Sequence, residues 1–121
     1  MTTDSTATSQ INFAKMDGLL PAIVQDDTTG QVLMLGFMNE ASWQHTQQTG
    51  YVTFWSRTRQ KLWTKGETSG NRLRIINVAT DCDQDTLLFR VDVEGDGLVC
   101  HEGTVSCFTR PIGLTTAGAQ K

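Results

Sequence analysis

The fold of this chain is decided by the stretch Leu73-Arg74-Ile75-Ile76-Asn77-Val78-Ala79-Thr80-Asp81-Cys82-Asp83-Gln84-Asp85-Thr86-Leu87-Leu88-Phe89-Arg90-Val91-Asp92-Val93. Two runs rich in apolar and β-branched residues, 73–78 and 87–93, flank the acidic segment 81–85. Runs of this composition predict strands. The second run ends at Glu94-Gly95-Asp96-Gly97, which is typical of a turn.

Three further segments are predicted outward from this stretch. The apolar run 32–37 follows a turn signal, and residues 51–55 are rich in aromatic and β-branched side chains, so both are predicted to be strands. Between them, Asn39 can cap a helix that Gly50 ends, and Glu40 lies in the first turn, where the helix dipole favours an anion. Such a helix has about ten residues and needs packing to be stable. The sequence therefore predicts an α+β fold that is predominantly β.

Length and charge limit the class of protein. A chain of 121 residues is enough for one small domain. Residues 1–10 are predicted to be a disordered tail, residues 11–112 the folded domain and residues 113–121 a C-terminal tail. The net charge of -3 argues against a dedicated nucleic-acid-binding protein. No apolar run approaches the roughly 20 residues that span a membrane, so no membrane partner is expected.

The first ten residues lack the basic start and the apolar stretch of a secretory signal, so a cytoplasmic location is expected. Disulfides are rare in that reducing compartment, and the three cysteines are an odd number. We therefore expect them to be free thiols or metal ligands.

The segment 81–85 carries the densest chemistry of the chain. Its carboxylates Asp81, Asp83 and Asp85 alternate with other residues. In an extended strand these three would share one face, and Cys82 would point to the other. Carboxylate oxygens suit magnesium or calcium, whereas a thiolate suits zinc. One short segment could thus present ligands for two different metals.

Two other interpretations of this segment stay open. Acidic turns on protein surfaces are often simply solvated. The pattern Asp-x-Asp-x-Asp also fits the start of an EF-hand loop, but the sixth position is Thr86 instead of glycine and the twelfth is Asp92 instead of glutamate.

Cys82, Cys100 and Cys107 form a possible zinc site. Cys100 and Cys107 are too far apart in sequence for the usual Cys-x2-4-Cys zinc knuckle, but a loop could return both to one metal. Three thiolates would leave one position open for water, as in a catalytic zinc site. The alternative is three buried free cysteines. His101 could be a fourth ligand, a general acid or base, or a structural loop residue.

Six of the ten basic residues lie between positions 57 and 74, around a glycine-bearing loop at 65–71. Arginine binds phosphate in bidentate fashion, and glycine lets backbone amides approach it, so a substrate with more than one phosphate is expected. Its predicted contacts are Arg57, Arg59, Lys65, Ser69 and Gly70. A solvated edge strand and a surface for single-stranded nucleic acid are the alternatives.

Six blocks of the sequence, in order between about residues 18 and 110, resemble the phosphoribosyl-AMP cyclohydrolase family. They are Leu20-Pro21-Ala22-Ile23-Val24-Gln25, Val32-Leu33-Met34-Leu35, Phe54-Trp55-Ser56-Arg57-Thr58-Arg59, Leu62-Trp63-Thr64-Lys65-Gly66-Glu67-Thr68-Ser69-Gly70, Asp81-Cys82-Asp83-Gln84-Asp85-Thr86-Leu87-Leu88 and Cys100-His101-Glu102-Gly103-Thr104-Val105-Ser106-Cys107-Phe108.

The resemblance implies an enzyme of histidine biosynthesis that opens the adenine ring of phosphoribosyl-AMP. It implies an intertwined homodimer, in which zinc is shared between subunits and Cys82 comes from the partner of the subunit that supplies Cys100 and Cys107. It also implies magnesium on the three aspartates and a catalytic role for His101. Asn71 and Leu73 stand where the family often has histidine and glutamine.

Two rival functions are retained. A structural zinc module could bind single-stranded nucleic acid through residues 55–74, and it would show salt-sensitive binding without turnover. A calcium-binding protein could use the three aspartates, and its calcium affinity would survive loss of the cysteines.

Overall fold

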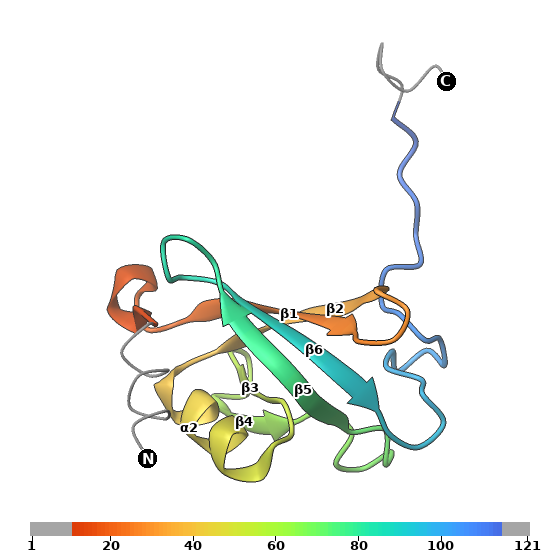
Figure 1. Cartoon of the computed structure of the whole chain (residues 1–121), viewed down its shortest axis with the longest axis horizontal. Helices are drawn as coiled ribbons and strands as arrows, with labels where there is room; N and C mark the ends of the chain where they lie inside the picture. Colours follow the sequence, from red (N-terminus) through yellow and green to blue (C-terminus); the bar gives the residue numbers. More distant parts are fainter. Residues whose placement is uncertain (1–10, 115–121) are drawn as a thin grey trace.

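A computed structural model describes residues 11–114 of the chain, which fold into one small, mainly β domain with a single α-helix (Figure 1). The predicted tail at 1–10 and most of the one at 113–121 lie outside these residues. The elements, in chain order, are the 3-10 helix η1 (Phe13–Met16), β1 (Leu20–Asp26), β2 (Val32–Met38), α2 (Glu40–Thr49), β3 (Thr53–Ser56), β4 (Lys61–Thr64), β5 (Leu73–Thr80) and β6 (Leu87–Val93).

A four-stranded sheet in the order β2-β1-β6-β5 forms one layer of the domain. The central strands β1 and β6 run parallel, with Val24 opposite Phe89, and each has an antiparallel neighbour. Alternate residues of β1 and β6, such as Val24, Phe89 and Val91, are fully buried. Their side chains therefore point to one face of the sheet, where the core lies.

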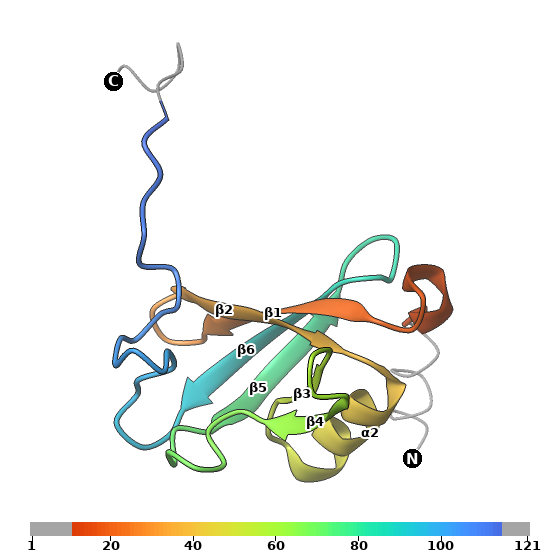
Figure 2. The same cartoon turned by 180° about the vertical axis from the view of Figure 1, so that it is seen from behind.

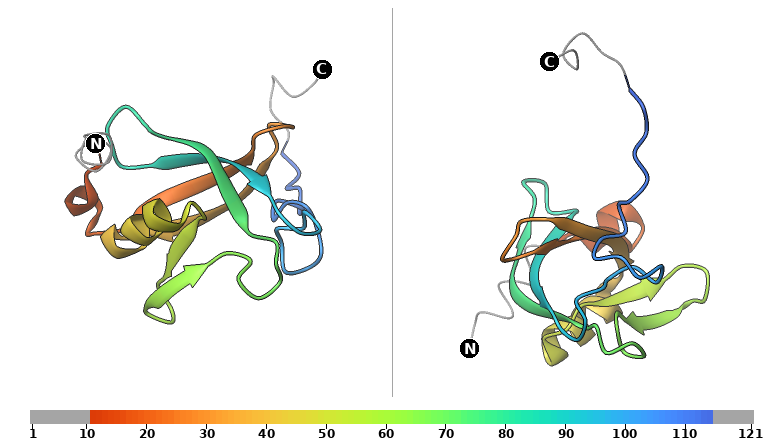
Figure 3. Two further views of the ribbon diagram at one scale, coloured as in Figure 1. Left: turned by 60° about the horizontal axis from the view of Figure 1, so that its bottom comes forward. Right: turned by 90° about the vertical axis from the view of Figure 1, so that its right-hand side faces the viewer.

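The helix α2 and the antiparallel hairpin of β3 and β4 lie together on the same side of this sheet (Figures 2 and 3). Trp43 of α2, which is buried, has its ring centroid 6.2 Å from that of Phe89. Phe54 of β3 is also buried and joins the same core cluster. The hairpin is thus held against the sheet at its β3 side, while β4 faces outward.

The helix begins and ends as the sequence predicts. Asn39 caps it by accepting a 2.9 Å hydrogen bond from the amide of Ser42, whose hydroxyl accepts one from the amide of Asn39. Gly50 ends it with φ 80°, in the left-handed region that glycine tolerates. The strands predicted at 32–37, 73–78 and 87–93 are also confirmed, within one or two residues.

Three local expectations need correction or addition. The segment 81–85 was expected to be extended, but it forms the turn between β5 and β6, with Gln84 at φ 67°. The strand expected at 51–55 begins at Thr53. Tyr51 instead forms an isolated bridge to Arg74 of β5. In addition, β1 and β4 form strands that composition alone did not single out.

Between residues 11 and 114 there is no helix of the length and apolar character that crossing a membrane requires.

Candidate active site

The loop that follows β6 brings two cysteines together. The amide of Cys100 donates to the carbonyl of Thr104 at 3.0 Å, and the amide of Gly103 donates back to the carbonyl of Cys100 at 2.9 Å. The chain then returns, and the amide of Cys107 donates to the carbonyl of Leu33 in β2 at 2.8 Å. This tight turn explains how six intervening residues still allow the two thiols to meet.

Ser106 anchors the returning arm of the loop. Its side chain is buried, and its hydroxyl donates to the carbonyl of Val32 at 2.8 Å and accepts from the amide of Phe108 at 3.0 Å. The position of Cys107 is therefore fixed on both sides by hydrogen bonds to β2 and within the loop.

The two thiols interact, and their surroundings move their pKa values in opposite directions. A hydrogen bond from the backbone amide of Glu102, with a further one from the Thr104 hydroxyl, lowers the pKa of Cys100. Partial desolvation, followed by the charge of Cys100, raises the pKa of Cys107, although that residue is exposed overall. Cys100 is therefore the thiol that ionises first.

A pocket of about 610 Å³ opens beside Cys100. On one side it is bounded by the Cys100–His101 turn, and on the other by β4 and the loop that follows it. Its lining residues include His101, and the cations among them are Arg59, Lys61 and Lys65. The pocket therefore joins a thiol and an imidazole to positive charge, although these groups lie some forty residues apart in sequence.

The predicted substrate contacts divide between three places. Arg59, Lys65 and Ser69 line this pocket. Gly70 lines a neighbouring hollow of about 670 Å³ instead. Arg57 lies over the ring of Phe37, with its guanidinium carbon 4.1 Å from the ring centroid, and is not among the residues lining either hollow.

The basic segment divides into cations that form ion pairs and cations that line the pocket. Arg72 and Arg74 form ion pairs with Glu94 at 3.3 Å and Asp92 at 2.7 Å, respectively, on the neighbouring strand β6 or just beyond it. Among the described residues, no salt bridge involves the three cations of the pocket. Their charge is therefore available to an anionic ligand.

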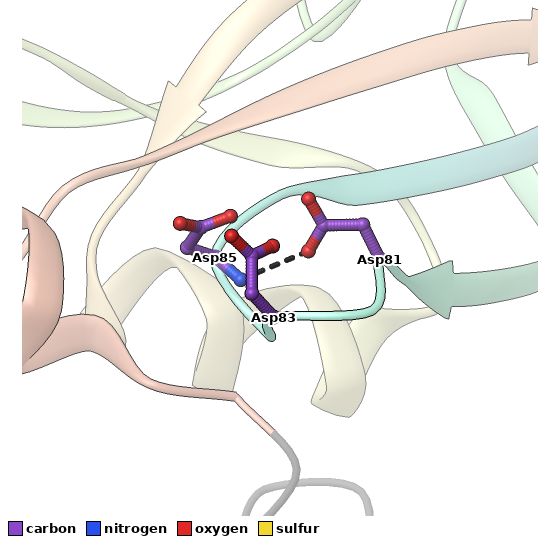
Figure 4. Close-up of side chains that lie close together, drawn as sticks. All are labelled: Asp81, Asp83 and Asp85. Carbon is purple, nitrogen blue, oxygen red and sulfur yellow. Dashed lines mark hydrogen bonds between the residues drawn. The ribbon is translucent and has the colours of Figure 1, made fainter.

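The carboxylates of Asp81, Asp83 and Asp85 converge at the other end of β6 (Figure 4). One oxygen from each lies within 4.8 Å of the others, which suits a metal ion held by hard oxygens. Desolvation opposes ionisation of Asp81, but hydrogen bonds from the amides of Asp85 (3.0 Å) and Thr86 (3.2 Å) outweigh it, and the pKa of Asp81 is lowered. The turn, not an extended strand, produces this convergence.

Cys82 lies in the same turn as the carboxylates and is exposed. The two ends of β6 are roughly 20 Å apart, because each of its seven residues advances the chain by about 3.3 Å. The loop with Cys100 and Cys107 follows the other end of β6 in the chain, and Figure 1 shows this loop and the turn between β5 and β6 at opposite ends of the sheet. Within one chain, Cys82 therefore does not join the other two thiols.

Some pocket residues were missing from the predicted contacts. Lys61, Leu62 and Trp63 of β4 all line the pocket, so alternation along the strand does not single them out. For Lys61, the available signal was its place in the run of cations from Arg57 to Lys65. Asn71 also lines the pocket, whereas Leu73 is fully buried in the core and does not contact a ligand.

The fold and the pocket define a small α+β protein in which side chains able to bind a metal lie opposite a cationic wall formed by Arg59, Lys61 and Lys65. A sequence model of phosphoribosyl-AMP cyclohydrolase matches residues 34–109. The chain is 53% identical over 102 residues to the phosphoribosyl-AMP cyclohydrolase of Solibacter usitatus, covering 84% of this chain and 80% of that protein. It is 54% identical over 103 residues to the enzyme of that name from Desulfatibacillum aliphaticivorans, with 85% and 82% covered.

A longer relative shows the same similarity. The histidine biosynthesis bifunctional protein of Photobacterium profundum is 57% identical over 98 residues, which cover 81% of this chain but only 46% of that protein. The chain thus spans about half the length of its bifunctional relatives. These matches show that the chain belongs to the phosphoribosyl-AMP cyclohydrolase family, a family of enzymes with a role in histidine biosynthesis.

Proposed function

We propose that the chain hydrolyses the bond between N1 and C6 of the adenine ring of phosphoribosyl-AMP. The product is the formimino-aminoimidazole carboxamide ribonucleotide intermediate of histidine biosynthesis. The observation that carries this proposal is the pocket in which Cys100 and His101 face Arg59, Lys61 and Lys65. A reactive purine with two phosphates needs a nucleophile and cations side by side.

Zinc fits the thiol site by its chemistry. Cys100 and Cys107 interact, and the lowered pKa of Cys100 favours the thiolate that zinc requires. The third ligand is Cys82 of the partner subunit, because this chain holds its own Cys82 at the far end of β6. When bound, zinc supplies Lewis-acid activation of water near neutral pH.

His101 is the proton carrier of the proposed reaction. It follows Cys100 directly and lines the pocket. A ring nitrogen of His101 takes a proton from the attacking water, whose oxygen becomes bonded to C6. The same nitrogen returns a proton to N1 as the bond between N1 and C6 breaks, so that the ring opens without a net change in protons.

The anionic parts of the substrate are held by the side of the pocket that carries Arg59, Lys61 and Lys65. Arg59, Lys65 and Ser69 are proposed to bind phosphate or ribose from within the pocket. Arg57 and Gly70, which do not line the pocket, remain predicted substrate contacts from positions outside it. Magnesium is proposed to bind the three aspartates, whose oxygens converge within 4.8 Å.

Assembly and location complete the proposal. A homodimer that shares its zinc sites would place the carboxylate turn of one subunit, which carries Cys82, beside the pocket of the other. The enzyme is proposed to act in the cytoplasm on this small phosphorylated nucleotide, without a nucleic-acid or membrane partner.

The test compares the wild type with Cys107→Ser for hydrolysis of phosphoribosyl-AMP, followed by the absorbance of the ring-opened product, with zinc counted in both. The wild type should turn over with about one zinc per chain, and the variant should lose both properties. A wild type that holds zinc but never opens the ring would refute the cyclohydrolase assignment and favour a structural zinc module.

A further inference from the structure

Asn71 occupies an unusual position for an amide side chain. It ends the glycine-bearing loop after β4 and is only 8% exposed. It lies where this loop meets the turn that follows β6, and the two segments run side by side (Figure 3). The first segment carries Lys65 of the cationic wall, and the second leads directly into Cys100 and His101.

Both ends of the Asn71 amide are used across this junction. Its Nδ2 donates to the carbonyl of Leu98 at 3.0 Å, and its Oδ1 accepts from the amide of Asp96 at 2.7 Å. Leu98 precedes Cys100 by only two residues. A buried amide that satisfies its donor and its acceptor across two loops fixes their separation, because a shift of either loop leaves a buried polar group unpaired.

The packing around Asn71 leaves no room for the loops to come closer or slide. A Cβ atom at Gly95, in the second loop, would collide with Oδ1 of Asn71 and the backbone carbonyl of Gly70 in the first loop. Within the first loop, a Cβ atom at Gly66 would collide with the backbone carbonyl of Asn71. Both glycines have positive φ, 70° and 82°. The two loops therefore approach as closely as their backbones allow, and Asn71 is the side chain that joins them.

We propose that Asn71 is a positioning residue that sets the distance between the cationic wall and the Cys100–His101 wall of the pocket. This inference rests on the proposed function. Substrate bound to Arg59 and Lys65 on one wall must present C6 to the groups on the other. A displacement of about 1 Å between the walls can cost about 100-fold in rate. Loss of the Asn71 bonds should therefore lower kcat, whereas KM, set mainly by the cations, should change little.

Two variants separate the two hydrogen bonds. Asn71→Asp keeps the acceptor for Asp96 but turns a carboxylate oxygen toward the carbonyl of Leu98, and Asn71→Ala removes both bonds. We expect kcat to fall between about 10-fold and 100-fold in both, with KM within about threefold of the wild type and zinc retained. Val24→Ala, a core variant of β1 outside the pocket, serves as the control for lost stability. It should lower Tm without lowering kcat per folded molecule.

Amide hydrogen exchange gives a readout that does not depend on activity. Exchange at Asp96 should quicken in Asn71→Ala but stay slow in Asn71→Asp, which keeps the acceptor. If the wild type opens the ring and Asn71→Ala keeps its kcat, or loses no more than Val24→Ala, the positioning role is refuted. If the wild type itself is inactive, the proposed function fails. In that case, unchanged exchange at the Asp96 amide in Asn71→Ala would independently refute the role of Asn71 in joining the two loops.

Discussion

The two ends of β6 carry two different kinds of ligand cluster. At one end, the turn 81–85 brings three carboxylates within 4.8 Å of one another from five consecutive residues. At the other end, the loop from Cys100 to Cys107 provides two interacting thiols and a histidine beside a cationic pocket. The first cluster gathers all three of its predicted ligands within one chain, whereas the second gathers only two of its three predicted thiols.

This difference supports the proposal that the active site is shared between two subunits. The proposed third thiol, Cys82, lies in the carboxylate turn of the same chain, at the other end of β6, a strand roughly 20 Å long. If a second subunit places its turn over the pocket, it supplies Cys82 and the three carboxylates at once. The oxygen cluster and the thiol cluster would then be parts of one active site built from two chains.

The carboxylate cluster is tested by Asp83→Asn. The variant removes one charged ligand but keeps the size of the side chain, so magnesium affinity should fall and activity at limiting magnesium should drop by about 100-fold. Zinc content should not change, because the thiols are untouched. Metal titrations monitored by activity and by metal analysis give the measurement.

Asp17→Asn is the matched control, since Asp17 is an exposed acid with φ 57°, a backbone conformation that asparagine tolerates well. It should leave magnesium dependence as in the wild type. Loss of zinc from Asp83→Asn would show that the two clusters do not bind their metals independently.

The cationic wall is tested by Arg59→Gln beside Arg57→Gln. Arg59 lines the pocket, so its loss should raise KM about tenfold, equivalent to about 1.4 kcal/mol of binding free energy. Arg57 lies against Phe37, and its variant should raise KM by less. Steady-state kinetics on both variants decide the order, and an equal or larger effect of Arg57→Gln would contradict the placement of the phosphate.

The smallest expected effect concerns the thiols of the zinc-free protein. The pKa of Cys100 is lowered and that of Cys107 is raised, so at neutral pH Cys100 holds the larger thiolate fraction. Iodoacetamide should alkylate Cys100 a few-fold faster than Cys107, as peptide mass spectrometry would show. Exposure alone predicts the reverse order, because Cys107 is exposed and Cys100 is half-buried.

Much of the fold could be predicted because its signals are local. The Asn39 cap, the αL position of Gly50 and the apolar runs at 32–37 and 87–93 each depend on residues close in sequence. The sequence does not predict β4, because its four residues, Lys61–Thr64, place two apolar residues side by side and show no alternation of polar and apolar side chains. At 81–85, the alternation of aspartates favours an extended strand, whereas the structure forms a turn in which Gln84 has positive φ.

The sequence names candidate site residues one by one but not their geometry. Spacing suggests two groups of possible metal ligands, yet it carries no information on which ends of β6 they occupy. The pairing of Arg72 and Arg74 with acids near β6 depends on strand register, which separates them from the pocket cations. The junction at Asn71 depends on two loops that are distant in sequence, so no local pattern could reveal it.

The most direct test of a thiol site shared between subunits mixes two inactive variants, Cys82→Ser and Cys107→Ser, by unfolding and refolding them together. In a mixed dimer, one site combines Cys100 and Cys107 of the first chain with Cys82 of the second and is intact. Random pairing should therefore restore about a quarter of wild-type activity and zinc content. Each variant refolded alone should stay inactive. If the mixture recovers neither activity nor zinc, the three thiols do not meet across subunits, and the account of a shared site is contradicted.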